Sequence, residues 1–247
     1  MLEINKIYNE DCLEGMKRID DKSVDMICCD LPYNKTACKW DKFIPFDKLW
    51  KQYNRIIKDN GAIVLFGIEP FSSYLRMSNI KYYRYDVIWK KQQATNPLIA
   101  KKQIMRIHEN ISIFYKKLPI YNPQMTYGHR QYSSFTDKNS KIGEIYGDYF
   151  STHRDCKDGS RYPISVLEFN TERTKLHPTQ KPVSLVEYLI KTYSNEGDLV
   201  LDNCMGSGTT AVACINTNRN FVGFETDEKY CNIANKRIED VRNQQDI

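Results

Sequence analysis

Residues 23–33 have the sequence SVDMICCDLPY, in which an apolar run is followed by Asp-Leu-Pro-Tyr. The apolar run that ends at Cys29 is typical of a buried strand. Pro32 cannot donate a hydrogen bond to a neighbouring strand, so we expect the strand to end there. Asp30 and Tyr33 then place a carboxylate and an aromatic ring at the strand's carboxyl end, where open α/β sheets bind ligands. A carboxylate and an aromatic ring together suit a flat ligand that carries an amino group. Taken alone, however, the four residues from Asp30 to Tyr33 favour an ordinary turn that ends a strand.

A second strand, turn and helix lie near the C-terminus, where residues 198–210 read DLVLDNCMGSGTT. The glycines allow the backbone to approach a ligand, and the helix N-terminus offers free N–H groups. Glu225 ends the next strand, 19 residues after Gly206. In dinucleotide-binding folds, a carboxylate at the corresponding position accepts hydrogen bonds from the hydroxyls of a ribose. The glycine patterns of a Walker loop and of a dinucleotide fingerprint are both incomplete. The turn therefore fits best a ligand that contains a nucleoside without a pyrophosphate, and S-adenosylmethionine is the commonest such cofactor. The alternative is that the turn is purely structural and binds no ligand.

Strand and helix patterns alternate along most of the chain. Strands are expected at 4–8, 23–29, 62–67, 85–89, 110–115, 198–201 and 221–225. Helices are expected at 13–19, 46–57, 71–77, 183–193, 210–216 and 227–241, with Asn60-Gly61 ending the second of them. This alternation predicts an α/β fold that is doubly wound around a mostly parallel, Rossmann-like sheet.

Residues 118–176 form the candidate insertion, because Leu, Ile and Val are scarce there. Their eight basic and seven acidic residues exclude a bulk electrostatic role. Tyr, Arg and Asn side chains in this range are suited to contact bases or phosphates, while an ordinary long surface loop is an equal alternative. We therefore divide the chain into 1–117, a small irregular insertion at 118–176, and 177–247, the outer two being halves of one domain.

Charge is distributed unevenly along the chain, whose formal net charge is +5. Residues 76–117 contain ten Lys or Arg against two acidic residues, which suits a polyanion such as DNA. A solvated face is the alternative reading. No apolar run reaches the roughly 20 residues needed to span a membrane, and the N-terminus lacks a signal peptide pattern. Eight cysteines without a Cys-x-x-Cys pair predict reduced thiols in a cytoplasmic protein and no metal site.

Three motifs together resemble the amino-group DNA methyltransferases. They are DLPY at 30–33, HPTQKP at 177–182 and LDNCMGSGTT at 201–210, and their order is that of the β class of this family. The resemblance extends across nearly the whole chain, including IPFD at 44–47 and HEN at 108–110. It looks closest to small adenine methyltransferases of phages and prophages, and implies DNA methylation of the restriction–modification or phage type.

The resemblance implies catalytic roles for Asp30, Leu31, Pro32 and Tyr33. Asp30 and the Leu31 carbonyl would accept hydrogen bonds from the target amine, and Tyr33 would stack on the flipped base. The expected cofactor contacts are Asp11, Cys12, Asp30, Phe66, Lys181, Asp202, Asn203, Cys204, Gly206, Ser207, Gly208, Thr209, Glu225 and Thr226. The expected DNA contacts are Lys35, Lys39, Lys90, Lys91, Lys101, Lys102, Arg106, Arg130, Arg154 and Arg161.

The chain departs from the family pattern at two places. Leu31 stands where the usual tetrapeptide has a proline, and Asn203-Cys204 replaces the usual Pro-Phe. The resemblance also implies a role for each part of the chain. Residues 1–117 would be the catalytic half of the domain, residues 177–247 its cofactor-binding half, and residues 118–176 the target-recognition insertion. A homodimer is one candidate assembly.

The implied activity is methyl transfer from S-adenosylmethionine to the N6 amine of adenine in a specific DNA sequence. N4 methylation of cytosine is the alternative within the same chemistry, because an initial Asp in the tetrapeptide favours adenine without excluding cytosine. A non-catalytic DNA-binding protein on the same fold is a further alternative. Methylation at cytosine C5 is disfavoured, because its family marks the required thiolate with Pro-Cys and this chain contains no such pair.

Overall fold

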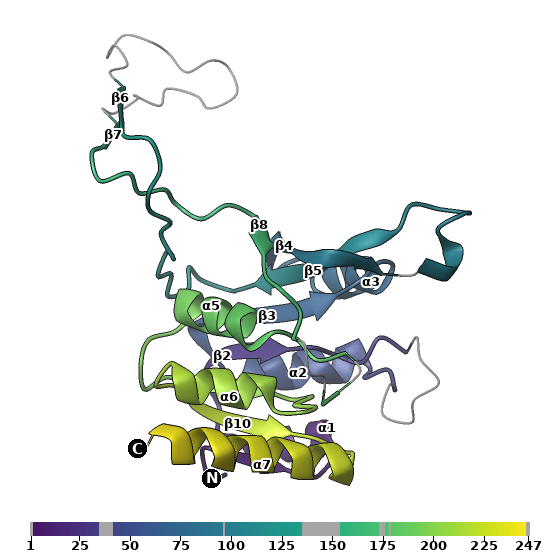
Figure 1. The fold of residues 1–247 in the computed structure, drawn as a ribbon. Helices are drawn as coiled ribbons and strands as arrows, with labels where there is room; N and C mark the ends of the chain where they lie inside the picture. Colours follow the sequence, from purple (N-terminus) through teal and green to yellow (C-terminus); the bar gives the residue numbers. More distant parts are fainter. Residues whose placement is uncertain are drawn as a thin grey trace. The chain divides into compact units, whose positions relative to one another are not determined.

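The computed structural model describes residues 2–34, 42–95, 97–134, 154–172, 176–177 and 179–245. The chain forms two compact units: the first comprises Met1–Asn122 and Ser165–Ile247, and the second comprises Pro123–Ile164. The first unit is built on an eight-stranded sheet with helices on both faces (Figure 1). The predicted α/β fold with a mostly parallel sheet is therefore confirmed.

The large sheet has the strand order β1-β10-β9-β2-β3-β5-β4-β8. The strands are β1 (Lys6–Tyr8), β2 (Val24–Cys29), β3 (Ile57–Gly67), β4 (Tyr83–Thr95), β5 (Arg106–Phe114), β8 (Val166–Glu168), β9 (Leu199–Asp202) and β10 (Asn220–Phe224). Only β5 runs antiparallel to its neighbours among these strands. The carboxyl ends of the parallel strands and the start of β5 consequently meet at one edge of the sheet.

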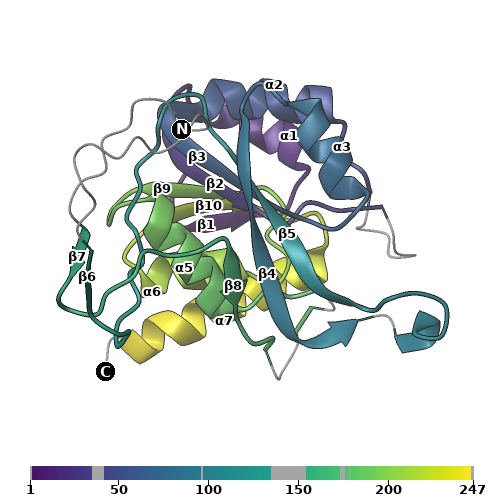
Figure 2. The same ribbon diagram turned by 90° about the horizontal axis from the view of Figure 1, so that it is seen from above.

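Helices cover both faces of this sheet (Figure 2). One face carries α5 (Val183–Tyr193), α6 (Thr209–Asn216) and α7 (Glu228–Gln245), and the other carries α1 (Cys12–Gly15), α2 (Phe46–Ile56) and α3 (Phe71–Ser78).

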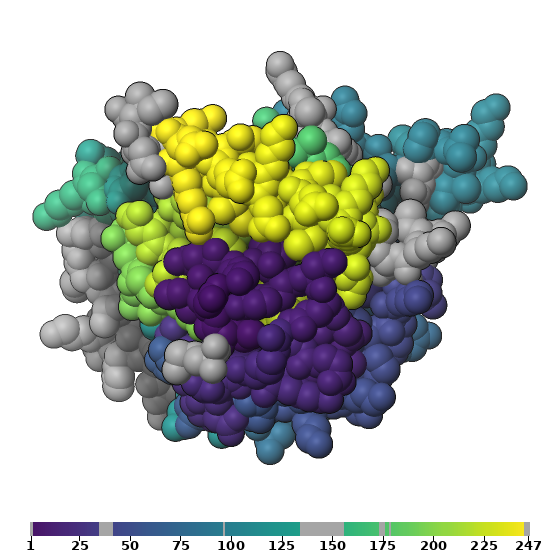
Figure 3. Space-filling view, turned by 90° about the horizontal axis from the view of Figure 1, so that it is seen from below, coloured from purple at the N-terminus to yellow at the C-terminus, as the bar shows by residue number. Residues whose placement is uncertain are grey.

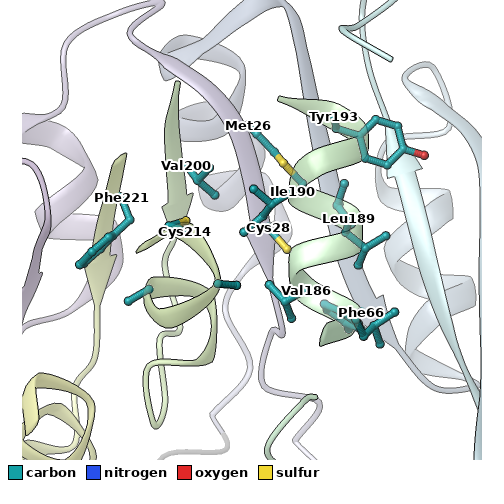
Figure 4. Packing of buried hydrophobic residues seen from close by; sticks show 14 of the residues in the cluster. Met26, Cys28, Phe66, Val186, Leu189, Ile190, Tyr193, Val200, Cys214 and Phe221 are labelled. Atoms are coloured by element: carbon teal, nitrogen blue, oxygen red, sulfur yellow. The ribbon is translucent and has the colours of Figure 1, made fainter. Parts of the chain in front are cut away.

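Strand β2 contributes to the core on both faces. Met26 and Cys28 pack with α5 in one cluster, as Figure 4 shows, and Ile27 and Cys29 pack with α2 in the other. A strand that is buried on both faces has a continuous apolar sequence, which explains the pattern that leads to Asp30.

The helix before β3 ends differently from the prediction. Helix α2 ends at Ile56, and β3 begins at the next residue, so Asn60-Gly61 lies inside β3 instead of ending the helix. A Cβ atom on Gly61 would lie 2.6 Å from the carbonyl oxygen of Asp25 on β2. The glycine therefore allows two strands to approach where their pairing register shifts.

The two ends of the chain lie side by side in the first unit. Figure 3 shows the N-terminal residues next to the C-terminal helix α7. β1 pairs with β10, the Asn5 amide donates to Asn220 Oδ1 at 2.9 Å, and Arg242 donates to the Asn5 carbonyl at 3.3 Å. None of the helices in the described ranges is long and apolar enough to cross a membrane.

The second unit contains a small antiparallel pair, β6 (Tyr132–Ser134) and β7 (Arg154–Cys156). The Arg161 guanidinium donates to Cys156 Sγ at 2.7 Å and lies 4.7 Å from the centre of the Tyr132 ring. β8 belongs to the first unit, so the large sheet extends into the range that we expected the insertion to cover.

We predict that Gly61→Ala lowers the free energy of unfolding by about 1 to 3 kcal/mol, because the added methyl group overpacks the contact between β2 and β3. Urea denaturation measures this change. Asn60→Ala is the matched control, since Asn60 is exposed one residue earlier in the same strand. An unchanged midpoint for Gly61→Ala would contradict the close approach described above.

Candidate functional site

A cavity of about 640 Å³ lies at the edge of the sheet where the parallel strands end. Its wall includes Asp11, Asp30, Asp202 and Glu225, which follow or end β1, β2, β9 and β10 respectively. The predicted catalytic residues all line this cavity, and so do the predicted cofactor residues except Gly208. The structure thus brings these residues together, while their individual roles stay predictions.

Asp30 is held by two neighbouring side chains. Its carboxylate forms an ion pair with Lys181, and the Tyr33 hydroxyl donates to it at 2.5 Å. Lys181 Nζ lies 3.3 Å from Glu109 Oε2, and Glu109 in turn pairs with Lys91. The cavity wall therefore contains four charged side chains of alternating sign, delivered by the end of β2, the segment before α5, β5 and β4.

The pKa values in this row reflect a competition between burial and pairing. Burial raises the pKa of Asp30, and Lys181 opposes that rise. Burial alone would lower the pKa of Lys181, but the two carboxylates outweigh it and raise this pKa. Burial likewise opposes ionisation of Glu109, but Lys181 and Lys91 outweigh it and hold its pKa below the ordinary value. Lys181 is thus the cation that favours an ionised Asp30.

The residues that follow Asp30 are fixed by packing. The Leu31 side chain is only 3% exposed and lies in the same buried cluster as α2. The Tyr33 ring packs at 4.8 Å between centroids against Phe71, the first residue of α3. Burial of the leucine side chain therefore restrains the backbone at the position where the family pattern has a proline.

The two glycines before α6 have different surroundings. Both have positive φ angles, +54° at Gly206 and +84° at Gly208, which suit glycine better than other residues. A Cβ atom on Gly208 would lie 2.9 Å from Ala234 Cβ of α7, whereas one on Gly206 would have no neighbour closer than 3.9 Å. Gly208 therefore allows two helices to pack, and Gly206 leaves open space at the cavity wall.

Asp202 and Glu225 are oriented by hydrogen bonds from nearby residues. Asp202 accepts from the Thr210 hydroxyl at 2.6 Å and from the Cys204 N–H at 3.0 Å, and burial raises its pKa to about 6. Glu225 accepts from the N–H groups of Gly206 at 2.7 Å and Asp227 at 2.9 Å. Carboxylate oxygens with free lone pairs can accept further hydrogen bonds, as a ribose requires. Within the described ranges, no cluster of His, Cys, Asp and Glu could hold a metal ion.

The unusual Asn203-Cys204 pair has a polar environment of its own. The Tyr53 hydroxyl of α2 donates to Asn203 Oδ1. The Asn203 amide nitrogen lies 3.5 Å from Cys12 Sγ and 3.4 Å from Cys204 Sγ. The buried asparagine is thus satisfied by partners that a Pro-Phe pair would not need. Elsewhere in the cavity wall, Lys181 Nζ lies 5.3 Å from the centre of the Phe66 ring.

The predicted DNA contacts are dispersed. Lys91 and Arg106 line the cavity, and the Lys91 side chain is paired with Glu109 instead of facing solvent. Lys90 pairs with Glu168 at 2.7 Å at the surface, while Lys101, Lys102 and Arg130 are exposed. The guanidinium of Arg161 is bound within the second unit. Lys35, Lys39 and the side chain of Arg154 lie outside the described residues.

Glu109 is a charged residue of the site to which the sequence motifs assign no role. Its side chain is 12% exposed and sits between Lys91 and Lys181. The available signal was a charged residue immediately before NISIF, whose two isoleucines and phenylalanine are typical of a buried strand. Such a residue requires a partner, and the inward-facing lysines provide it.

The chain is similar to known proteins over most of its length. Residues 24–236 match the family model described as DNA methylase. The type II methyltransferase M1.MboII of Moraxella bovis is 29% identical, over 95% of this chain and 96% of that protein. M.HinfI of Haemophilus influenzae is 28% identical, over 97% of this chain and 69% of that protein.

Solved structures are similar as well. The M1.HpyAVI–SAM complex is 25% identical, with a TM-score of 0.64 over 94% of this chain and 98% of that chain. The PvuII DNA methyltransferase, described as cytosine-N4-specific, is 16% identical with a TM-score of 0.65 over 96% of this chain and 91% of that chain, and so shares the fold.

We predict that Lys181→Met raises the pKa of Asp30 further, because removing the neighbouring positive charge leaves the effect of burial unopposed. Carboxyl NMR titration of protein labelled at aspartate measures the shift. Lys90→Met is the control, since Lys90 pairs with the exposed Glu168 instead. Equal pKa values in the wild type and Lys181→Met would show that Lys181 does not favour the ionised form.

Proposed function

The chain belongs to the N6/N4 amino DNA methyltransferase family, and on this basis we propose that it methylates the exocyclic N6 amine of adenine within a specific DNA sequence. The enzyme uses S-adenosyl-L-methionine as its methyl donor. The observation that supports this activity best is the position of Asp30: its paired carboxylate shares one cavity with Asp202, Gly206 and Glu225.

The proposed chemistry starts from a poor nucleophile. The lone pair of an exocyclic amine is conjugated with the ring, and hydrogen bonds from both N–H groups favour a tetrahedral nitrogen whose lone pair is free. Asp30 and the Leu31 carbonyl are the proposed acceptors. The amine then attacks the sulfonium methyl group in line, and the nitrogen–carbon bond forms as the carbon–sulfur bond breaks to leave a neutral thioether. The extra proton passes from the nitrogen to solvent. Positioning and preorganised charges supply the rate enhancement, without a covalent intermediate.

Each part of the cavity has a proposed ligand group. The carboxylate of Glu225 receives the ribose hydroxyls, and Asp11 receives the adenine amine of the cofactor. Asp202 and the backbone around Gly206 hold the methionine part. Tyr33 stacks on the target base, because its ring lies beside Asp30 and is backed by Phe71.

Adenine is proposed as the base because the catalytic tetrapeptide begins with Asp. Cytosine N4 is the second candidate, since its exocyclic amine needs the same two acceptors and the cytosine-N4-specific PvuII enzyme has the same fold. The homologous type II methyltransferases support a place in restriction–modification. Target recognition is proposed for residues 118–176, whose Tyr, Arg and Asn side chains can contact bases.

We expect Asp30→Ala to reduce methyl transfer to DNA at least about 100-fold, which is the typical effect of removing one group that stabilises the transition state. Binding of S-adenosylmethionine, measured by calorimetry, should remain. Asp30→Asn separates the loss of charge from the loss of side-chain length. Asp20→Ala is the matched control, because Asp20 is an exposed aspartate that precedes β2 in the sequence, whereas Asp30 follows this strand at the cavity. Full activity of Asp30→Ala would rule out the proposed mechanism.

The identity of the base is tested directly by mass spectrometry of nucleosides from DNA treated with the protein and S-adenosylmethionine. N6-methyladenine is the expected product. Detection of N4-methylcytosine instead would assign the second candidate. DNA without either nucleoside, from protein that still binds DNA, would assign the non-catalytic alternative.

A further inference from the structure

The hairpin formed by β4 and β5 extends beyond the rest of the sheet. The two strands pair from Tyr83↔Phe114 to Thr95↔Arg106, and a short 3-10 helix at Pro97–Ile99 lies in the connection between them. Figure 2 shows this end of the hairpin projecting past the helices of the first unit. The described residues 97–105 are therefore positioned to meet a partner from outside.

Apolar side chains at the end of this hairpin face solvent. Leu98 is 98% exposed and Ile104 is 95% exposed, while Met105 and Ile107 are 41% and 38% exposed. Single exposed apolar residues are common at protein surfaces. Four within ten residues, at the end of a projecting hairpin, are instead typical of a surface that contacts a partner.

The charge of the same segment selects the partner. No acidic residue occurs from Gln92 to His108, whereas Lys101, Lys102 and Arg106 are basic. Lys101 and Lys102 are exposed in the connection itself. A basic segment with exposed apolar side chains matches a nucleic acid, whose phosphates bind the lysines and whose stacked bases accept apolar contacts.

The base of the hairpin connects this surface to the catalytic cavity. Lys91, Thr95 and Arg106 belong to the two strands of the hairpin and line the cavity that contains Asp30. A target base in this cavity would remain covalently joined to neighbouring nucleotides. These nucleotides must leave the cavity along its wall, and the hairpin forms part of that wall, so it is positioned to contact the adjoining duplex.

We propose that the end of the hairpin enters the duplex beside the target base, with Leu98 as the side chain that occupies the gap left in the base stack. The inference rests on the proposed DNA methylation. Unstacking a base costs a few kcal/mol, and an inserted apolar side chain offsets part of this cost. Lys101 and Lys102 bind the flanking phosphates and hold the hairpin in place.

The test first maps the methylated sequence by long-read sequencing of DNA from cells that express the protein. Methylation rates are then measured on two synthetic duplexes that contain the mapped site. In one duplex the target base is paired normally, and in the other it faces an abasic site, so that no base pair must be broken. Wild type protein must methylate both duplexes; if it methylates neither, the proposed function fails before the hairpin is tested.

For Leu98→Ala we expect a rate on the paired duplex about 10-fold below wild type, equivalent to about 1.4 kcal/mol. On the duplex with the abasic site, the two proteins should differ less than about 2-fold, because little energy is needed to extrude the base. Ile4→Ala is the matched control, since Ile4 is 52% exposed and lies outside both the hairpin and residues 118–176. It should match wild type on both duplexes.

Other outcomes overturn the proposal. If Leu98→Ala lowers the methylation rate equally on both duplexes, Leu98 contributes to DNA binding in general and not to the gap in the base stack. If the variant and wild type have equal rates on both duplexes, Leu98 has no role in the reaction. Sedimentation of the free protein provides a separate reading, because a dimer that dissociates in Leu98→Ala would assign the hairpin to a second copy of the chain.

Lys101→Gln should reduce the salt dependence of DNA binding by about one phosphate contact, and an unchanged slope would oppose the phosphate role.

Discussion

The ion pair between Lys181 and Asp30 is the interaction on which the proposed active site depends. A carboxylate that accepts hydrogen bonds from a target amine has to be ionised, and burial opposes ionisation. Lys181 counters this effect, and Glu109 keeps Lys181 charged while being neutralised itself by Lys91. A buried charge left without its partner destabilises a fold strongly, so these four side chains act as one unit. In the proposed mechanism, Asp30 would share its oxygens between the lysine and the target amine.

The sequence predicted the parts of the site that follow from strand topology. Asp30, Asp202 and Glu225 each follow or end an apolar run, and parallel strands bring such positions to one edge. The role of Lys91 was harder to predict. A basic run is recognised by composition, which does not distinguish a lysine that faces solvent from one that turns inward to Glu109. Its partner is distant in sequence, so only the fold reveals the pair.

Local signals failed where one residue type serves two purposes. A glycine after a helical pattern usually ends the helix, but Gly61 instead allows β2 and β3 to approach each other. The predicted strands at 85–89 and 110–115 covered only parts of β4 and β5, because the polar remainder of each lacks an apolar pattern. This unpredicted part is the hairpin that borders the cavity. Leu31 shows the converse, since side-chain burial restrains a backbone that proline restrains elsewhere in the family.

The second unit is inserted into the first in a way that allows the inserted sequence to change during evolution. The chain leaves the first unit at Asn122, whose N–H donates to the Thr192 carbonyl at 2.8 Å, and returns at Ser165, whose carbonyl accepts from the Ile88 N–H at 2.7 Å. Both attachment points are therefore anchored independently of the intervening sequence. Because loop closure entropy grows only slowly with length, the segment can be lengthened or replaced at a cost of about 0.6 kcal/mol per doubling. In the proposed role of target recognition, such an exchangeable module would let new DNA sequences be recognised while the catalytic cavity is inherited unchanged.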